Sequence, residues 1–293
     1  MPAPFAVLAP HIKDLGGGFL VRRSLPAVAR QAVGPFLFFD HFGPIEAGPE
    51  DNHDVRPHPH IGLATVTYLF EGAMLHRDST GIVQRIEPGA INWMSAGRGI
   101  VHSERTPEDL RGVRRRSHGL QLWAALPAAD EEMAPAFSHT AAADLPQVEA
   151  GGARVRVLIG SAFGATSPVA TRSPTLYLDI DLAAGDAFPL PLAVERAVYG
   201  IEGDFELDGQ RFEAQQMLVL HEGDETMLSA TGDARVVLIG GEPLGQRHLY
   251  WNFVSSRKER LVQAAADWEA NCFPQVPGET EFIPLPAQRP GAD

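Results

Sequence analysis

The chain has 293 residues, of which 44% are hydrophobic and 21% charged, a composition ordinary for a globular protein with a sizeable core. Its length exceeds that of one typical domain, so two domains are expected. The formal net charge of −13 argues against a general nucleic-acid or membrane-surface binder. No stretch approaches the ~20 apolar residues that a membrane-spanning helix needs.

Two further features bear on the compartment of the protein. Cys272 is the single cysteine, which excludes an intrachain disulfide and a thiolate metal cage. The N-terminal stretch MPAPFAVLAPHIKD lacks the basic start and continuous apolar core of a signal peptide. We therefore expect a protein of the reducing cytoplasm, and we expect it to be a monomer.

Short runs with strand character, bounded by Gly, Pro, Asp and Asn, dominate the chain and predict β-sandwiches or β-barrels. In chain order they are FLFFDHF (36–42), ATVTYLF (64–70), INWM (91–94), LQLWAAL (120–126), RVRVLIG (154–160), TLYLDIDL (175–182), AVYGIEG (197–203), QMLVLHEGD (216–224) and ARVVLIGG (234–241). The basic run RGVRRRSHG, from Arg111, is interpreted as a solvated loop between strands.

The segment 138–153 is rich in small residues, Pro and Gly, and is interpreted as a linker between an N-terminal domain (1–137) and a C-terminal domain (154–293). An internal echo links the two domains: TYLFEG followed by IEPGAINWM resembles VYGIEG followed by FEAQQMLVL. Each reads as strand, turn at Glu-Gly, strand, turn and strand, which suggests a duplicated barrel.

One helix is expected near the C-terminus, in SSRKERLVQAAADWEA. Ser256 and Glu259 have the spacing of a capping box at its start. Leu261, Ala265 and Trp268 fall on one face at helical spacing, as expected of a helix that covers a barrel.

Histidines are concentrated in the first half, where nine of the 11 lie before residue 140. In RPHPHIG, His58 and His60 are two positions apart, so in an extended strand both side chains point to one face. His102 and Glu104 form a second such pair in GIVHSE. Two pairs on neighbouring strands that face inward would bring three imidazoles and one carboxylate together.

This donor set suits Fe, Mn, Ni, Cu or Zn, and ligand chemistry does not choose among them. With four protein ligands an octahedral metal keeps two open positions, whereas tetrahedral zinc would be closed and structural. Other polar residues are given structural interpretations. His76 is taken as a hydrogen-bonded residue at the barrel end, and Asp40 and His41 as a buried pair.

The blocks HPHIGLATVTYLFEG, HRDSTG, PGAINWMSAGRGIVHSE and HGLQLW resemble the pirin family, a branch of the cupin superfamily. The stretches FFDHFGP, RSPTLYLDIDL and GEPLGQ also resemble pirins, so the resemblance runs from about residue 19 to about residue 270. It implies an all-β bicupin, which consists of two antiparallel, jelly-roll-like β-barrels, here followed by a C-terminal helix.

The resemblance implies one divalent metal in the N-terminal barrel, with His58, His60, His102 and Glu104 as ligands, and iron is our first choice. Many cupins, and many pirins, carry a glutamate shortly after the His-x-His pair, where this chain has Leu63, Ala64 and Thr65. The C-terminal barrel has no His-x-His and is expected to be metal-free. Side chains such as Leu178, Val198 and Val219 should fill it.

Two functions follow from the resemblance. The first is a quercetin 2,3-dioxygenase-type enzyme that binds a flavonol at the metal and cleaves its heterocycle with O2, with Glu104 as the catalytic proton acceptor. The second is a non-enzymatic regulator whose iron oxidation state alters a surface that docks a partner protein. The acidic composition favours a protein partner over direct contact with nucleic acid.

Overall fold

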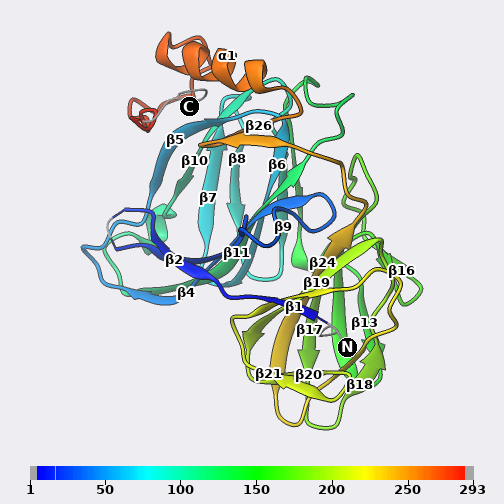
Figure 1. The fold of residues 1–293 in the computed structure, drawn as a ribbon. Helices are drawn as coiled ribbons and strands as arrows, with labels where there is room; N and C mark the ends of the chain where they lie inside the picture. Colours follow the sequence, from blue (N-terminus) through cyan, green and yellow to red (C-terminus); the bar gives the residue numbers. More distant parts are fainter. Residues whose placement is uncertain (1–4, 17, 288–293) are drawn as a thin grey trace. The chain divides into compact units, whose positions relative to one another are not determined.

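The computed structural model describes residues 5–16 and 18–287, and nearly all of their regular structure consists of antiparallel strands (Figure 1). The chain divides into two compact units. The unit that we call the histidine barrel comprises residues 14–21, 41–139 and 244–293, and the unit that we call the apolar barrel comprises residues 1–13, 22–40 and 140–243. Residues 1–4, 17 and 288–293 of these ranges lie outside the described part of the chain.

These units differ in composition from the domains 1–137 and 154–293 that the sequence suggested, since each takes residues from both halves of the chain. The segment 138–153 contains regular structure: the end of β12 (Ala136–Thr140), a 3-10 helix (Ala142–Asp144) and β13 (Gln147–Ala150). The small residues of this segment predicted a linker, but the segment forms regular structure.

Two sheets build most of the histidine barrel. The larger sheet has seven strands in the order β12, β9 (Ile91–Ser95), β6 (Leu63–Glu71), β11 (Arg115–Ala125), β4 (Phe36–Ala47), β3 (Leu20–Leu25) and β2 (His11–Asp14). Of these strands, β2, β3 and β4 also contribute residues to the other unit. The smaller has four strands in the order β5 (Val55–His60), β10 (Ile100–Arg105), β7 (Met74–Asp78) and β8 (Val83–Ile86). A 3-10 helix (Glu108–Leu110) follows β10.

The apolar barrel repeats this plan. Its seven-stranded sheet has the order β1 (Phe5–Leu8), β22 (Met217–Leu220), β19 (Glu195–Glu202), β24 (Ala234–Gly241), β17 (Thr175–Leu182), β14 (Ala153–Ile159) and β13. Its four-stranded sheet has the order β18 (Ala187–Pro189), β23 (Met227–Ser229), β20 (Phe205–Leu207) and β21 (Gln210–Phe212), and β15 (Ser161–Ala162) pairs with β16 (Ala165–Thr166). The two similar sequence segments form equivalent strand pairs: β6 pairs with β9 in the histidine barrel, and β19 pairs with β22 in the apolar barrel. The sheet order thus confirms the duplication predicted from the sequence.

Apolar side chains fill the second of these barrels. Leu178, Val198 and Leu218 belong to its core cluster, as the sequence led us to expect for the first two. Val219 is buried but lies outside that cluster, because neighbouring residues of a strand point to opposite faces.

The proline between the first two histidines has a structural reason. β5 is the outermost strand of its sheet, and only β10 pairs with it there. Proline lacks the N–H group that a central strand must donate, so an edge strand tolerates Pro57 and Pro59. His58 and His60 thus occupy alternate positions of an edge strand and point to the same face.

The one α-helix among the described residues, α1 (Lys258–Glu269), lies beside β26 (Phe253–Ser255), which pairs with β25 (His248–Tyr250) in the histidine barrel (Figure 1). Leu261, Ala265 and Trp268 are buried, which confirms the predicted face. The capping box is wrong: the N-cap is Arg257, without a side-chain cap, because Ser256 instead bonds to Glu131.

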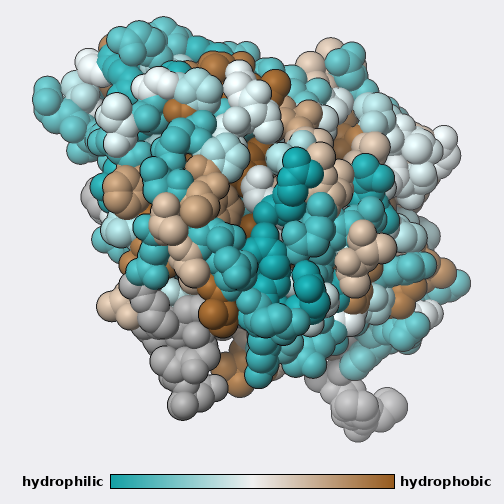
Figure 2. All heavy atoms as spheres, turned by 90° about the horizontal axis from the view of Figure 1, so that it is seen from above, coloured by the Kyte–Doolittle hydropathy of each residue, from teal (hydrophilic) through white to brown (hydrophobic). Residues whose placement is uncertain are grey.

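In the described part of the chain, no helix has both the length and the apolar character needed to cross a membrane. The face drawn in Figure 2 is mostly hydrophilic, and its hydrophobic residues occur in small separate groups.

Candidate metal centre and adjoining pocket

Three neighbouring strands of the smaller sheet each carry a pair of polar residues two positions apart. β5 carries His58 and His60, β10 carries His102 and Glu104, and β7 carries His76 and Asp78. The register places His102 opposite His58 on one side and opposite Asp78 on the other. The antiparallel pairing therefore builds one polar face across β5, β10 and β7.

Three imidazoles gather on this face. His58, His60 and His102 are buried, and each offers a ring nitrogen within 4.8 Å of those of the other two. The Nε2 atoms of His60 and His102 are 3.1 Å apart. Within the described ranges, no other group of three or more His, Cys, Asp or Glu residues meets this criterion.

The electrostatics of these histidines fit a metal. Burial lowers the pKa of His58 to about 4 and lowers the pKa values of His60 and His102 well below the ordinary value, so all three rings are neutral at pH 7. Neutral imidazole is the form that donates a lone pair to a metal.

The hydrogen bonds also orient the rings. His58 Nδ1 donates to the Arg56 carbonyl (2.8 Å) and His60 Nδ1 to the Asn252 carbonyl (3.1 Å), which leaves each Nε2 available as a ligand atom. His102 Nδ1 is buried without a hydrogen-bond partner in the described residues. The donor set thus fits a divalent transition metal.

Glu104 lies apart from the three imidazoles. It does not belong to the group whose ligand atoms lie within 4.8 Å of one another, and the pairing of β10 with β5 is irregular between His102 and Glu104. Its carboxylate accepts a hydrogen bond from Gln121 Nε2 (3.2 Å), whose side-chain carbonyl in turn accepts one from Thr67 (2.9 Å). Burial raises the pKa of Glu104 to about 7.

Sequence reasoning missed part of this face. Asp78 is fully buried and pairs with His76 Nε2 (2.9 Å), whose ring centroid lies 5.3 Å from that of His102. His76 is therefore hydrogen-bonded, as expected, and is also part of the polar face. The signal was present in the stretch HRD, which has the same two-residue spacing as the other two pairs.

Asp40 and His41 are both buried, but they have separate partners. Asp40 forms an ion pair with Arg23 (2.7 Å), and His41 Nε2 lies 2.8 Å from His118 Nε2. The expected pairing between them is therefore not the main contact of either.

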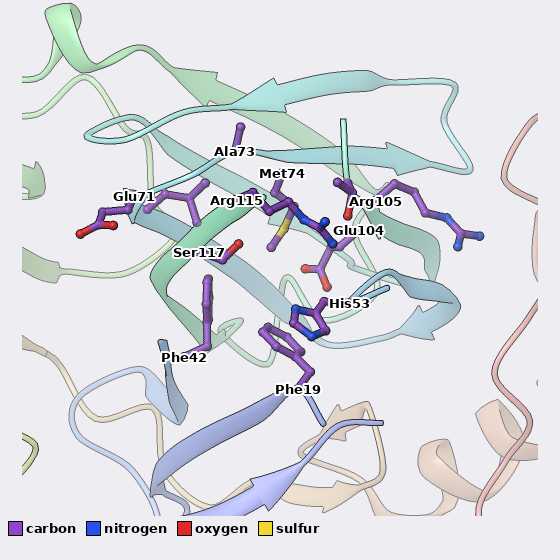
Figure 3. A pocket seen from close by; sticks show the side chains of 12 residues that line it. Phe19, Phe42, His53, Glu71, Ala73, Met74, Glu104, Arg105, Arg115 and Ser117 are labelled. Atoms are coloured by element: carbon purple, nitrogen blue, oxygen red, sulfur yellow. The ribbon is translucent and has the colours of Figure 1, made fainter. Parts of the chain in front are cut away.

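A pocket of about 470 Å³, open solvent included, adjoins the polar face through Glu104 (Figure 3). Its walls include Phe19, Phe42, His53 and Arg115, and none of the three clustered histidines lines it. Arg115 begins β11 and is half-buried, so the interpretation of this basic run as a solvated loop is wrong at this position.

Two family models match the chain: "Pirin" over residues 18–124 and "Pirin C-terminal cupin domain" over residues 177–274. A pirin-like protein of Caulobacter vibrioides is 48% identical over 280 residues, which cover 94% of this chain and 96% of the relative. A Pseudomonas aeruginosa protein, provisionally named a quercetin 2,3-dioxygenase, is 39% identical over 87% of this chain and 81% of its own length.

Among solved structures, one titled quercetin 2,3-dioxygenase, from Acinetobacter baumannii, superposes with a TM-score of 0.90. It is 33% identical in sequence, and the match covers 97% of this chain and 95% of that one.

Proposed function

Because this chain belongs to the pirin family, with its two cupin barrels, we propose that it is a quercetin 2,3-dioxygenase-type enzyme that acts on a flavonol-like aromatic substrate. The observation that carries this proposal is the buried cluster of three neutral histidines next to a pocket lined by Glu104. The names of two relatives support the reaction class.

His58, His60 and His102 would hold the metal, and we propose Glu104 as the fourth ligand. Such a metal would supply Lewis acidity and redox chemistry with O2. We favour iron, because three nitrogens and one oxygen leave open positions and suit oxygen chemistry, while Ni, Mn, Zn and Cu share the same ligand preferences. The net charge of −13 and the single cysteine support a monomer in the cytoplasm.

Glu104 would also hold a proton. It lines the pocket, so a substrate hydroxyl placed there can donate its proton to a Glu104 carboxylate oxygen. Gln121 would keep that carboxylate oriented through its amide hydrogen bond.

The test begins with anaerobic loading of Fe(II), followed by measurement of bound metal and of O2 uptake with quercetin. We expect one metal per chain and quercetin-dependent O2 uptake, both lost in the His58→Ala, His102→Ala double variant. Glu104→Gln should lower turnover per bound metal more than it lowers affinity for the flavonol.

Full metal occupancy in the double variant would refute the ligand assignment. Fully loaded protein that consumes no O2 above background would refute the enzyme. A partner protein whose affinity then changed between Fe(II) and Fe(III) would favour the redox-dependent regulator instead.

A further inference from the structure

The pocket beside Glu104 contains an arginine that no carboxylate neutralises among the described residues. Arg115 donates to two backbone carbonyls, those of Gly48 (3.2 Å) and Asp51, and takes part in no ion pair within 4.0 Å in that part of the chain. Figure 3 shows its guanidinium turned into the pocket, on the side of His53 and Glu104.

Other carboxylates near Arg115 already have partners. The Asp51 carboxylate accepts the amide of Gly48 (2.7 Å), and Asp54 pairs with Arg111 (2.8 Å) and Arg105 (3.6 Å). The positive charge of Arg115 is therefore available to a ligand in the pocket.

Apart from Glu104, the remaining charged residues of the pocket wall are paired with residues outside it. Arg105 pairs with Glu279 and Glu281, and Glu71 pairs with Arg116 (3.1 Å). In Figure 3 the side chains of Arg105 and Glu71 point away from the pocket. Arg115 is thus the cation on this wall that a ligand would meet.

Next to this charge lies an aromatic wall. The rings of Phe19 and His53 are stacked, with centroids 5.2 Å apart and planes 19° apart, and Phe42 lies 5.6 Å from Phe19. Phe19, Phe42, Leu69 and, at its edge, Met74 belong to one apolar cluster, so this wall is continuous with the core. Burial, with a contribution from Arg115, lowers the pKa of His53, so its ring is neutral at pH 7 and does not compete for an anion.

We propose that this pocket binds an aromatic carboxylate, with the ring against Phe19 and Phe42 and the carboxylate on the Arg115 guanidinium. A guanidinium matches a carboxylate in shape and charge, and flat aromatic groups pack well on aromatic walls. The inference goes beyond the proposed function, because a flavonol carries no carboxylate and the pocket is here assigned a further class of ligand.

Calorimetric titration with 2-naphthoate and 2-naphthamide, which share a shape and differ in charge, tests the inference. The full chain is stripped of metal with a chelator first, because a carboxylate could otherwise bind the metal directly. We expect 2-naphthoate to bind at least about tenfold more tightly than 2-naphthamide, since hydrogen bonds to charged groups are the stronger ones. Added salt should weaken the binding of 2-naphthoate alone.

Arg115→Gln should bring the ratio of the two affinities close to one. Arg114→Gln is the matched control, because this exposed neighbour removes the same charge without lining the pocket. It should keep the ratio of the native chain. Phe19→Ala should weaken both ligands alike.

Equal binding of the two probes by the native chain, no binding of either, or an unchanged ratio in Arg115→Gln would overturn the inference. The salt series needs no variant, so it decides the matter even if Arg115→Gln fails to fold. Because the titrations use metal-free protein, their result is independent of whether the iron-loaded chain consumes O2. Failure of this inference is thereby distinguished from failure of the proposed function.

Discussion

Glu131 connects the segment after residue 244 to the rest of the histidine barrel, and Glu131→Gln should destabilise the protein strongly. Its side chain is 3% exposed, and its carboxylate lies 2.9 Å from Arg247 Nε. It also accepts hydrogen bonds from the Ser255 hydroxyl (3.0 Å) and from the amide and hydroxyl of Ser256. Because the Arg247 side chain is only 9% exposed, the variant would leave its charge buried without a carboxylate, with only backbone carbonyls as hydrogen-bond acceptors.

Removing one partner of a buried ion pair destabilises a protein by about 3–5 kcal/mol. Glutamine keeps one acceptor oxygen for the serine groups, so we expect a loss of about 3 kcal/mol in the free energy of unfolding, at the low end of that range. Urea unfolding followed by tryptophan fluorescence measures this loss.

Glu132→Gln is the matched control. Glu132 is the next residue, its side chain is 46% exposed, and it pairs with Arg257 and Arg260. Exposed pairs of this kind contribute less than about 1 kcal/mol. Equal losses in the two variants, or a loss below about 1 kcal/mol in Glu131→Gln, would refute the reasoning.

Two further predictions concern the backbone after β5 and the acid stability of the barrel. Gly62→Ala should destabilise by more than about 3 kcal/mol, because φ is +67° and an added Cβ would lie 2.0 Å from the Val254 carbonyl oxygen. Gly81→Ala, at φ +93° with open space around it, should lose only about 1 kcal/mol by thermal unfolding. For Glu279, burial alone would raise the pKa, but hydrogen bonds from Arg105 and Ser103 hold it below the ordinary 4.5. The ionised Glu279 carboxylate therefore stabilises the folded state at neutral pH, and this stabilisation is lost as the pH falls below about 4.5. The difference in urea midpoint between the native chain and Glu279→Gln should accordingly shrink between pH 7 and pH 4.

Period-two spacing predicted the site well within single strands. It placed His58 and His60 on one face because side chains alternate strictly along an extended strand. The same rule applied to His102 and Glu104, yet it could not foresee the irregular pairing between these residues or the Gln121 amide that holds Glu104 at the pocket. Spacing along one strand says nothing about which side chains neighbouring strands bring up beside it.

Elements of the fold were predicted more completely than its division into units. Apolar runs such as 36–42 and 175–182 identified strands, because burial on both faces leaves a continuous hydrophobic signature. No local pattern showed that residues 22–40 belong with the C-terminal half or that residues 244–293 return to the histidine barrel. Long-range contacts decide such exchanges, and the small residues of 138–153 carried no information about them.

The charges that face the pocket are one carboxylate, Glu104, and one guanidinium, Arg115. At the positions where many cupins carry a glutamate after His-x-His, Leu63, Ala64 and Thr65 are buried side chains without a carboxylate. Glu104 and Arg115 are thus the charged pocket residues without an ion-pair partner within 4.0 Å in the described part of the chain. A wall with one such carboxylate and one such guanidinium repels an anion less than a wall with two carboxylates would. If the carboxylate preference depends on this balance, Ser117→Glu, at a residue that lines the pocket, should reduce the ratio of 2-naphthoate to 2-naphthamide affinity while Arg115 stays in place. An unchanged ratio in a folded Ser117→Glu variant would show that Arg115 alone sets the preference.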